Sequence, residues 1–206
     1  TAGEVYAFGY GTNNSPNLAN TGIVEAGKTA TLEIKGAYTV NDPLRIYGAS
    51  RMQTLDMSGA ADHLKNGFDL GKCTALRELN MQSGTGGSTG WWLSIGTCQQ
   101  RRTVNLRNQQ QAKTGGSTST ELDFTTQSKL QYLDARGTQV KSISFAKGSP
   151  LTEAMLPNKL TVLRLEYLSK LTTDGLSLES YANVKTLIVD GCPNINWETL
   201  LARCSN

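Results

Sequence analysis

Acidic side chains at repeated positions are the residues of this chain whose type and spacing could do chemistry. Each follows or precedes an apolar residue at a similar place in a recurring pattern, with amides and arginines nearby. Paired carboxylates are the usual tool for cleaving a glycosidic bond. Because these acids are interspersed with other polar groups, we favour a solvated binding face and keep a glycan-cleaving site as the alternative. The candidate residues on this face are Asp56, Glu78, Asn80, Asn105, Arg107, Asp134 and Arg136.

Aromatic side chains give the second set of binding candidates. In the run Trp91–Ile95, alternation places Leu93 and Ile95 inside and points Trp92 outward. Exposed aromatic rings serve both glycan and protein contacts. Tyr47 and Tyr132 are expected to face solvent in the same way. An equally weighted alternative packs Trp92 under a neighbouring loop as local core.

Signals for an enzyme are poor. The single histidine, His63, has no serine or cysteine partner at a suggestive spacing, and the chain has no phosphate-loop or dinucleotide fingerprint. The glycine-rich stretch 84–90 precedes an expected strand and lacks the lysine that a phosphate loop needs. We therefore predict no catalytic residue, no cofactor and no metal site.

Four cysteines leave the redox compartment open. Cys73 and Cys98 lie one repeat apart, so they could form a disulfide or a column of buried thiols. Cys192 and Cys204 could clip the C-terminal segment to the rest of the chain. The spacing is wrong for a zinc site, which favours C-x-x-C pairs.

The residues above are positioned by a repeat in the apolar residues. The pattern h-x-x-h-x-h, with h apolar, has central residues 24 or 25 positions apart at Leu55, Leu79 and Val104, and again at Leu163 and Leu187. Repeats of this length and pattern are typical of leucine-rich solenoids. The pattern begins at Met52, Leu76, Leu130, Val140, Leu160 and Val184, and a weaker copy begins at Arg101.

A second apolar series falls between the first. It includes Phe68–Leu70, Leu93–Ile95 and Leu176–Leu178, each 13 or 14 residues past a central leucine. Each coil is therefore expected to carry two short strands, one on each face. Between Leu133 and Leu163 the steps shorten to 10, 11 and 9 residues, and the sequence leaves open which face each strand joins there.

Three segments follow from these patterns: an N-terminal cap at 1–28, a solenoid at 29–191 and a C-terminal cap at 192–206. The first segment holds a candidate strand at 4–8, and the last a candidate helix at 196–203. We expect Asn196 to be its N-cap and Trp197 to shield the last coil. Residues 108–117 form a polar, glutamine-rich excursion.

The amino-acid composition limits the classes of protein to which this chain can belong. The 206 residues are 38% hydrophobic and 18% charged, with a net charge of +3 that is spread along the chain. A nucleic-acid-binding protein usually concentrates its basic residues on one face, and a membrane-spanning helix needs about 20 apolar residues in a row. We therefore expect neither nucleic acid nor membrane insertion. The beginning at Thr1 and the end at Asn206 suggest part of a longer polypeptide.

The expected fold is mainly β, a right-handed leucine-rich-repeat or β-solenoid with short strands on two faces, an irregular N-terminal cap and a short C-terminal helix. In the style of its repeats at 42–50, 76–81 and 184–193, the chain resembles leucine-rich-repeat-like proteins of gut Bacteroidetes and of the phages that infect them. That resemblance covers roughly residues 29–203.

The resemblance implies a non-enzymatic part of a phage virion, in its tail or an appendage, which contacts other protein subunits of the assembly or a host-surface protein or glycan. It supplies no catalytic residues. The alternative is a leucine-rich adhesin on the bacterial cell surface. A glycan depolymerase using Asp56 and Glu78 ranks third.

Overall fold

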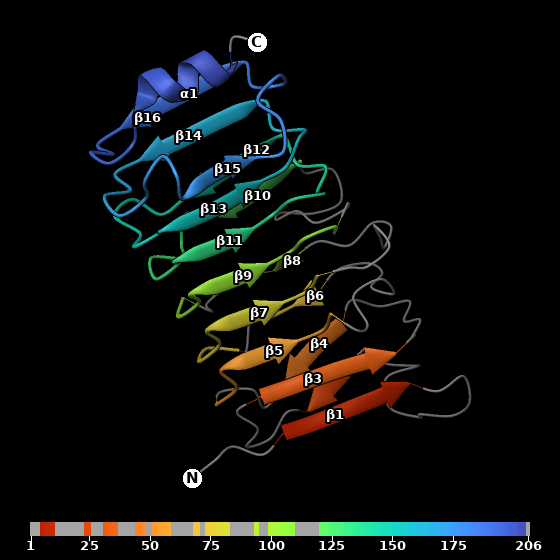
Figure 1. The fold of residues 1–206 in the computed structure, drawn as a ribbon. Helices are drawn as coiled ribbons and strands as arrows, with labels where there is room; N and C mark the ends of the chain where they lie inside the picture. The colour runs from red at the N-terminus through yellow and green to blue at the C-terminus, as the bar shows by residue number, and fades with distance from the viewer. Residues whose placement is uncertain are drawn as a thin grey trace.

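The computed structural model shows a mainly β, parallel β-solenoid closed by one short C-terminal helix, as the sequence predicts (Figure 1). The residues described are 5–10, 23–25, 31–36, 44–47, 51–58, 68–70, 73–82, 93–94, 99–109 and 120–204. Coils stack along one axis, with the N-terminus at one end and the helix at the other.

One face of the solenoid is an eight-stranded parallel sheet, here sheet A, made by the odd-numbered strands. Its strands pair in chain order, so each coil adds one strand next to the previous one. Sheet A contains β1 (Val5–Tyr10), β3 (Thr31–Gly36), β5 (Thr54–Asp56), β7 (Glu78–Asn80), β9 (Thr103–Asn105), β11 (Tyr132–Asp134), β13 (Glu153–Leu156) and β15 (Leu176–Leu178).

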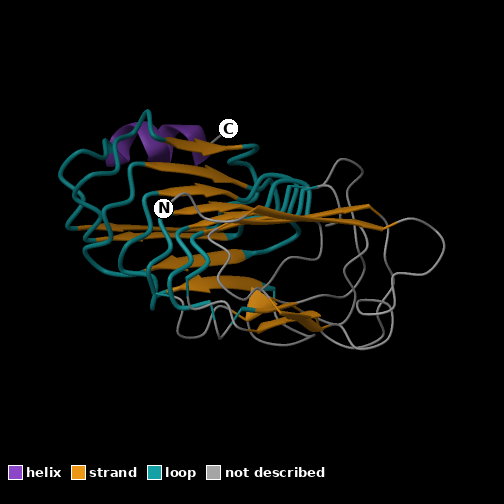
Figure 2. Ribbon diagram, turned by 90° about the horizontal axis from the view of Figure 1, so that it is seen from below, coloured by secondary structure: helices purple, strands orange, loops and turns teal. Residues whose placement is uncertain are grey.

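The even-numbered strands form two four-stranded parallel sheets opposite sheet A (Figure 2). Sheet B contains β2 (Ile23–Glu25), β4 (Leu44–Tyr47), β6 (Phe68–Asp69) and β8 (Leu93–Ser94). Sheet C contains β10 (Glu121–Phe124), β12 (Ser142–Phe145), β14 (Val162–Glu166) and β16 (Thr186–Asp190). The segment 1–28 thus contributes β1 and β2, which pair in parallel with β3 and β4.

The strict alternation of strands settles which face each repeat joins. Leu133 pairs with Ala154 in sheet A, whereas Ile143 pairs with Leu163 in sheet C. The short steps of 10, 11 and 9 residues are therefore successive half-coils. As a result the longer apolar motif, carried by sheet A up to Leu133, is carried by sheet C from Ile143 onward, and Leu176 continues the sheet A column.

Inward side chains from both faces make one continuous core. In the part of the chain whose side chains are described, the inward residue at the centre of each sheet A strand is at most 2% exposed, and those of β10, β12 and β14 are equally buried. Burying one such side chain contributes roughly 1.5–3 kcal/mol. These residues are Leu55, Leu79, Val104, Leu133, Ala154 and Leu176 from sheet A, with Leu122, Ile143 and Leu163 from sheet C.

Polar residues are also buried here, among them Arg101 and Gln109. Arg101 is fully buried at the position where other repeats carry Met52, Leu76 or Leu130. Gln109 is also fully buried, and its Nε2 donates to the carbonyl oxygen of Met81 at 2.8 Å. The expected polar excursion is therefore wrong at Gln109, because an internal hydrogen bond fixes this side chain against the preceding coil. Residues 110–119 lie outside the described part.

The helix α1 (Trp197–Cys204) closes the C-terminal end. Asn196 is its N-cap as expected, since its Oδ1 accepts the Thr199 backbone N–H at 2.9 Å. The expectation that Trp197 shields the last coil is wrong. Trp197 is 55% exposed, and Leu200 is fully buried instead, because the helix turns this next apolar position toward the core.

Candidate functional site

The candidate residues lie on the outer face of sheet A, where strand register sorts them into two rows. Residues of one row are direct partners on neighbouring strands, about 4.8 Å apart. The first row is Thr54, Glu78, Thr103, Tyr132 and Glu153. The second row is Asp56, Asn80, Asn105, Asp134, Met155 and Ser177. Alternation along each strand points both rows away from the core, as the sequence predicts.

Aspartate and asparagine in the second row bond the backbone of their own strand ends. In each case Oδ1 accepts the N–H two residues further on. The bonds run from Ser58 to Asp56 (2.9 Å), Gln82 to Asn80 (3.2 Å), Arg107 to Asn105 (3.1 Å) and Arg136 to Asp134 (3.1 Å). Asp123 on β10 accepts the Thr125 N–H at 2.8 Å in the same way. These side chains therefore end the strands and start the turns.

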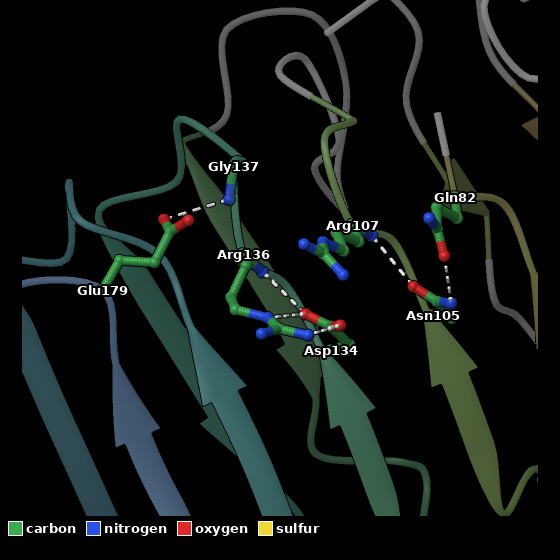
Figure 3. Close-up of polar contacts among 7 residues, drawn as sticks. All are labelled: Gln82, Asn105, Arg107, Asp134, Arg136, Gly137 and Glu179. Carbon is green, nitrogen blue, oxygen red and sulfur yellow. Dashed lines mark hydrogen bonds and ion pairs between the residues drawn. The ribbon is translucent and has the colours of Figure 1, made fainter. Parts of the chain in front are cut away.

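Asp134 and Arg136 form the strongest polar contact of this face (Figure 3). Arg136 donates from Nε to Oδ1 at 3.0 Å and from Nη2 to Oδ2 at 2.7 Å. The Asp134 side chain is only 3% exposed, and the hydrogen bond raises the pKa of Arg136. Both Asp134 oxygens are thus occupied, so this carboxylate is a structural group.

Neighbouring turns are tied to one another beside the second row. Asn105 Nδ2 donates to Gln82 Oε1 at 3.3 Å across adjacent coils (Figure 3). One carboxylate oxygen of Glu179 accepts the backbone N–H of Gly137 at 3.0 Å and that of Asn158 at 3.1 Å. The sequence pattern did not indicate Gln82 or Glu179, because both lie just beyond the strands, where the apolar period carries no information.

The first row is the more exposed of the two. Thr54 Oγ1 donates to Glu78 Oε2 at 3.4 Å, and Glu78 remains exposed. Burial, then the charges of Asp134 and Glu153, raise the pKa of Tyr132. Tyr132 is half-buried, and Arg107, in the turn after β9, is exposed.

The acidic residues of sheet A are spread over both rows. Glu33 of β3 is the direct partner of Asp56 in the second row. Among the residues whose side chains are described, no two carboxylates of one row are direct partners on neighbouring strands. Asp56 and Glu78 are diagonal neighbours in different rows, and each already accepts a hydrogen bond from this face. Among the described residues, no group of three or more His, Cys, Asp or Glu side chains could hold a metal ion.

Three sequence candidates lie beyond what can be placed. Trp92 and His63 lie outside the described residues, and Tyr47 lies in β4, of which only the backbone is described. Cys98 also lies outside the described residues, whereas Cys73 is buried.

Cys192 and Cys204 are both free thiols, so the suggested clip between them does not form. Cys192 Sγ instead accepts the Leu168 N–H at 3.4 Å and donates to the Asp190 carbonyl oxygen at 3.4 Å. Burial raises the pKa of both thiols. The C-terminal segment is therefore held by packing and hydrogen bonds.

Fold and face together define a parallel β-solenoid that displays a polar sheet. Comparison with known proteins adds no relative, since no family model, curated protein or solved structure matches the chain. No helix in the described part of the chain is long and apolar enough to cross a membrane.

Proposed function

We propose that the chain is a non-enzymatic structural and binding module that presents the outer face of sheet A to another protein subunit or to a host-surface glycan. The observation that supports this proposal is the hydrogen bonding of the second row. Its aspartates and asparagines bond their own backbone, which makes a face of fixed geometry. Fixed polar groups lower the entropy that a partner's binding would otherwise cost.

Glu78 and Tyr132 of the first row and Arg107 from the turn after β9 supply the contact groups of this proposal. Tyrosine and arginine are the side chains most often found at the centre of protein interfaces. Tyr132 and Arg107 lie on neighbouring coils, with Glu78 one coil further along. The style of the repeats supports a place in a phage virion, in its tail or an appendage, with the adhesin of a bacterial surface as the alternative.

Binding of the fluorescently labelled chain to intact gut Bacteroidetes cells, with and without capsule, tests this proposal. Saturable, strain-dependent binding that falls in Arg107→Ala and Tyr132→Ala would support host contact through this face. The matched control is Lys141→Ala, which removes an exposed side chain on the opposite side of the coil. Absence of binding to every strain would exclude host contact and leave a structural role within an assembly.

Incubation with capsular polysaccharide tests the non-enzymatic part. We expect no release of reducing sugar. If the chain released reducing sugar and the Asp56→Asn or Glu78→Gln variant did not, the proposal of a binding module would be wrong and the chain would be a glycan depolymerase.

A further inference from the structure

The turn that follows β14 differs from its neighbours at the end of the sheet C strands. After β12, β14 and β16, one residue adopts left-handed backbone directly before a buried residue. These residues are Gly148 (φ 73°), Tyr167 (φ 57°) and Gly191 (φ 60°). Glycine adopts this conformation freely, whereas it is strained for a bulky residue. Tyr167 therefore occupies a place that glycine holds on the coils before and after it.

Both neighbouring coils hold Tyr167 in this strained conformation. Its N–H donates to the carbonyl oxygen of Asp190 at 2.7 Å, and its carbonyl oxygen accepts the Gly148 N–H at 3.1 Å. A Cβ on Gly191 would lie 2.6 Å from Cδ1 and 3.0 Å from Cε1 of the Tyr167 ring. The ring thus rests against the backbone of Gly191, which leaves room for it, and its position is fixed.

The fixed ring is displayed to solvent. Tyr167 is 47% exposed, whereas Tyr132 and Tyr181 are more buried. A residue that stays outside the core does not need a strained backbone for packing. Strained conformations cluster at sites that contact ligands. The combination of strain, fixed position and exposure therefore points to a ring that is kept for contact with a ligand.

Charged side chains adjoin the ring. Lys147 Nζ lies 5.1 Å from the centroid of the Tyr167 ring and 3.5 Å from Glu166 Oε1. Arg164 Nη1 donates to Glu166 Oε2 at 3.2 Å. The side chains of Lys147 and Arg164 are 67% and 48% exposed. Because an ammonium has three N–H donors and a guanidinium has five, both cations keep donors for a ligand while Glu166 holds them in place.

The charges of this group balance. Lys147 and Arg164 supply two positive charges, and Glu166 and its exposed partner on β16, Asp190, supply two negative ones. A strongly charged ligand would therefore meet as much repulsion as attraction. A neutral sugar fits better, because its C–H groups are apolar and its hydroxyls both donate and accept hydrogen bonds.

We propose that Tyr167, Lys147, Glu166 and Arg164 form a binding subsite for one residue of a neutral saccharide. The sugar lies with its C–H groups against the exposed part of the Tyr167 ring. Its hydroxyls accept hydrogen bonds from Lys147 and Arg164 and donate to Glu166. The long side chain of Lys147 is flexible enough to turn from the aromatic ring to the sugar. This goes beyond the proposed function, because the subsite lies at the end of the sheet C strands and not on the outer face of sheet A.

Saturation-transfer NMR of the full chain with neutral oligosaccharides tests the subsite. The probes are linear hexasaccharides of glucose, mannose, galactose and xylose. We expect at least one to bind with a Kd in the millimolar range or below, and to bind about tenfold more weakly to Tyr167→Gly. The matched control is Trp197→Ala, since Trp197 is an exposed aromatic residue elsewhere on the chain and its loss should leave the affinity unchanged.

Two outcomes of this experiment would overturn the proposal. The first is that none of the four probes binds at about 10 mM, the weak end of specific affinities. The second is that a hexasaccharide of galacturonic acid, which carries a carboxylate on every residue, binds more tightly than all of them.

The stability of Tyr167→Gly separates ligand contact from packing. Glycine relieves the strain of this turn, which offsets the greater freedom of its unfolded chain. The variant should therefore unfold at about the same urea concentration as the wild type. A clearly lower midpoint together with unchanged saccharide binding would assign the ring to packing.

Variants of sheet A separate this subsite from the proposed function. Arg107→Ala and Tyr132→Ala should retain the saccharide binding that Tyr167→Gly loses. The reverse result, with binding lost in the sheet A variants and retained in Tyr167→Gly, would place the glycan on sheet A and refute the subsite. Loss of cell binding in the sheet A variants alone would leave both proposals standing, since each face would then have its own ligand.

Discussion

Asn108 and Gly137 occupy the same turn on successive coils, and both adopt left-handed backbone, with φ of 62° and 74°. The Asn108 N–H donates to the carbonyl oxygen of Arg136, the residue before Gly137, at 2.7 Å. A Cβ at position 137 would lie 2.6 Å from Asn108 Oδ1 and 2.9 Å from Asn108 Cα. The two residues therefore stack so closely that only one of them can carry a side chain.

Gly137→Ala should destabilise the chain for two reasons: the left-handed backbone conformation at this position disfavours a side chain, and the added Cβ would overlap with Asn108. The left-handed conformation costs about 1–2 kcal/mol for an L residue, and the overlap with Asn108 adds about 1–3 kcal/mol. Gly148→Ala is the matched control, since Gly148 has φ of 73° but nothing within 4 Å of the added Cβ. Urea denaturation should show the larger loss at 137; equal losses would refute the close stacking.

Asp134→Ala should lower the free energy of unfolding by about 1–3 kcal/mol, because it removes the acceptor of the Arg136 backbone N–H and of its guanidinium. Asp134→Asn keeps an oxygen for the backbone bond and should lose less. Thermal denaturation of both variants distinguishes them. An unchanged melting temperature in Asp134→Ala would show that the pair contributes nothing to stability.

Leu163→Asp should prevent folding or cost several kcal/mol, because an unpaired charge would be buried in a residue that is 1% exposed. Thr186→Asp is the control, an exposed position on the neighbouring strand β16. Circular dichroism and thermal melting would follow both. If Leu163→Asp melted like the wild type, the inward assignment of the sheet C leucines would be wrong.

Stability should fall at alkaline pH through Cys192. Burial raises its pKa in the folded state, so the unfolded chain loses this proton first. The contribution is therefore complete below the ordinary thiol pKa of about 8.5 and is lost as the pH rises through the raised value. Cys192→Ser keeps an acceptor for Leu168 but does not titrate there. Urea denaturation at pH 7 and pH 9.5 should show a smaller decline in that variant; the same decline would assign it to other groups.

The spacing of leucines predicted the solenoid because burial imposes the same inward positions on every coil. It predicted the outward rows for the same reason. The spacing could not assign the strands between Leu133 and Leu163 to one face or the other. A half-coil and a short full coil give the same pattern of apolar residues in the sequence. Trp197 was misplaced because Leu200, three residues further on and about 60° around the helix from it, is the residue that faces the core.

The bonding role of the second row was missed although a signal exists. Asp or Asn directly follows the central apolar residue at Leu55, Leu79, Val104, Leu122 and Leu133. Read as surface charge, these residues suggested a binding or catalytic set. Their recurrence at one place in the coil fits the local turn that such side chains stabilise. Contacts such as Glu179 to Gly137 depend on coil stacking, which no local pattern encodes.

Sheet A runs through all eight of its strands, while the opposite face changes from sheet B to sheet C between β8 and β10. Hydrogen bonds between stacked coils lie along the axis, so a pull on the two ends would load them in series. Among the described strands, sheet A alone continues across the change from sheet B to sheet C, so its ladder of hydrogen bonds would carry the tension from one half of the rod to the other.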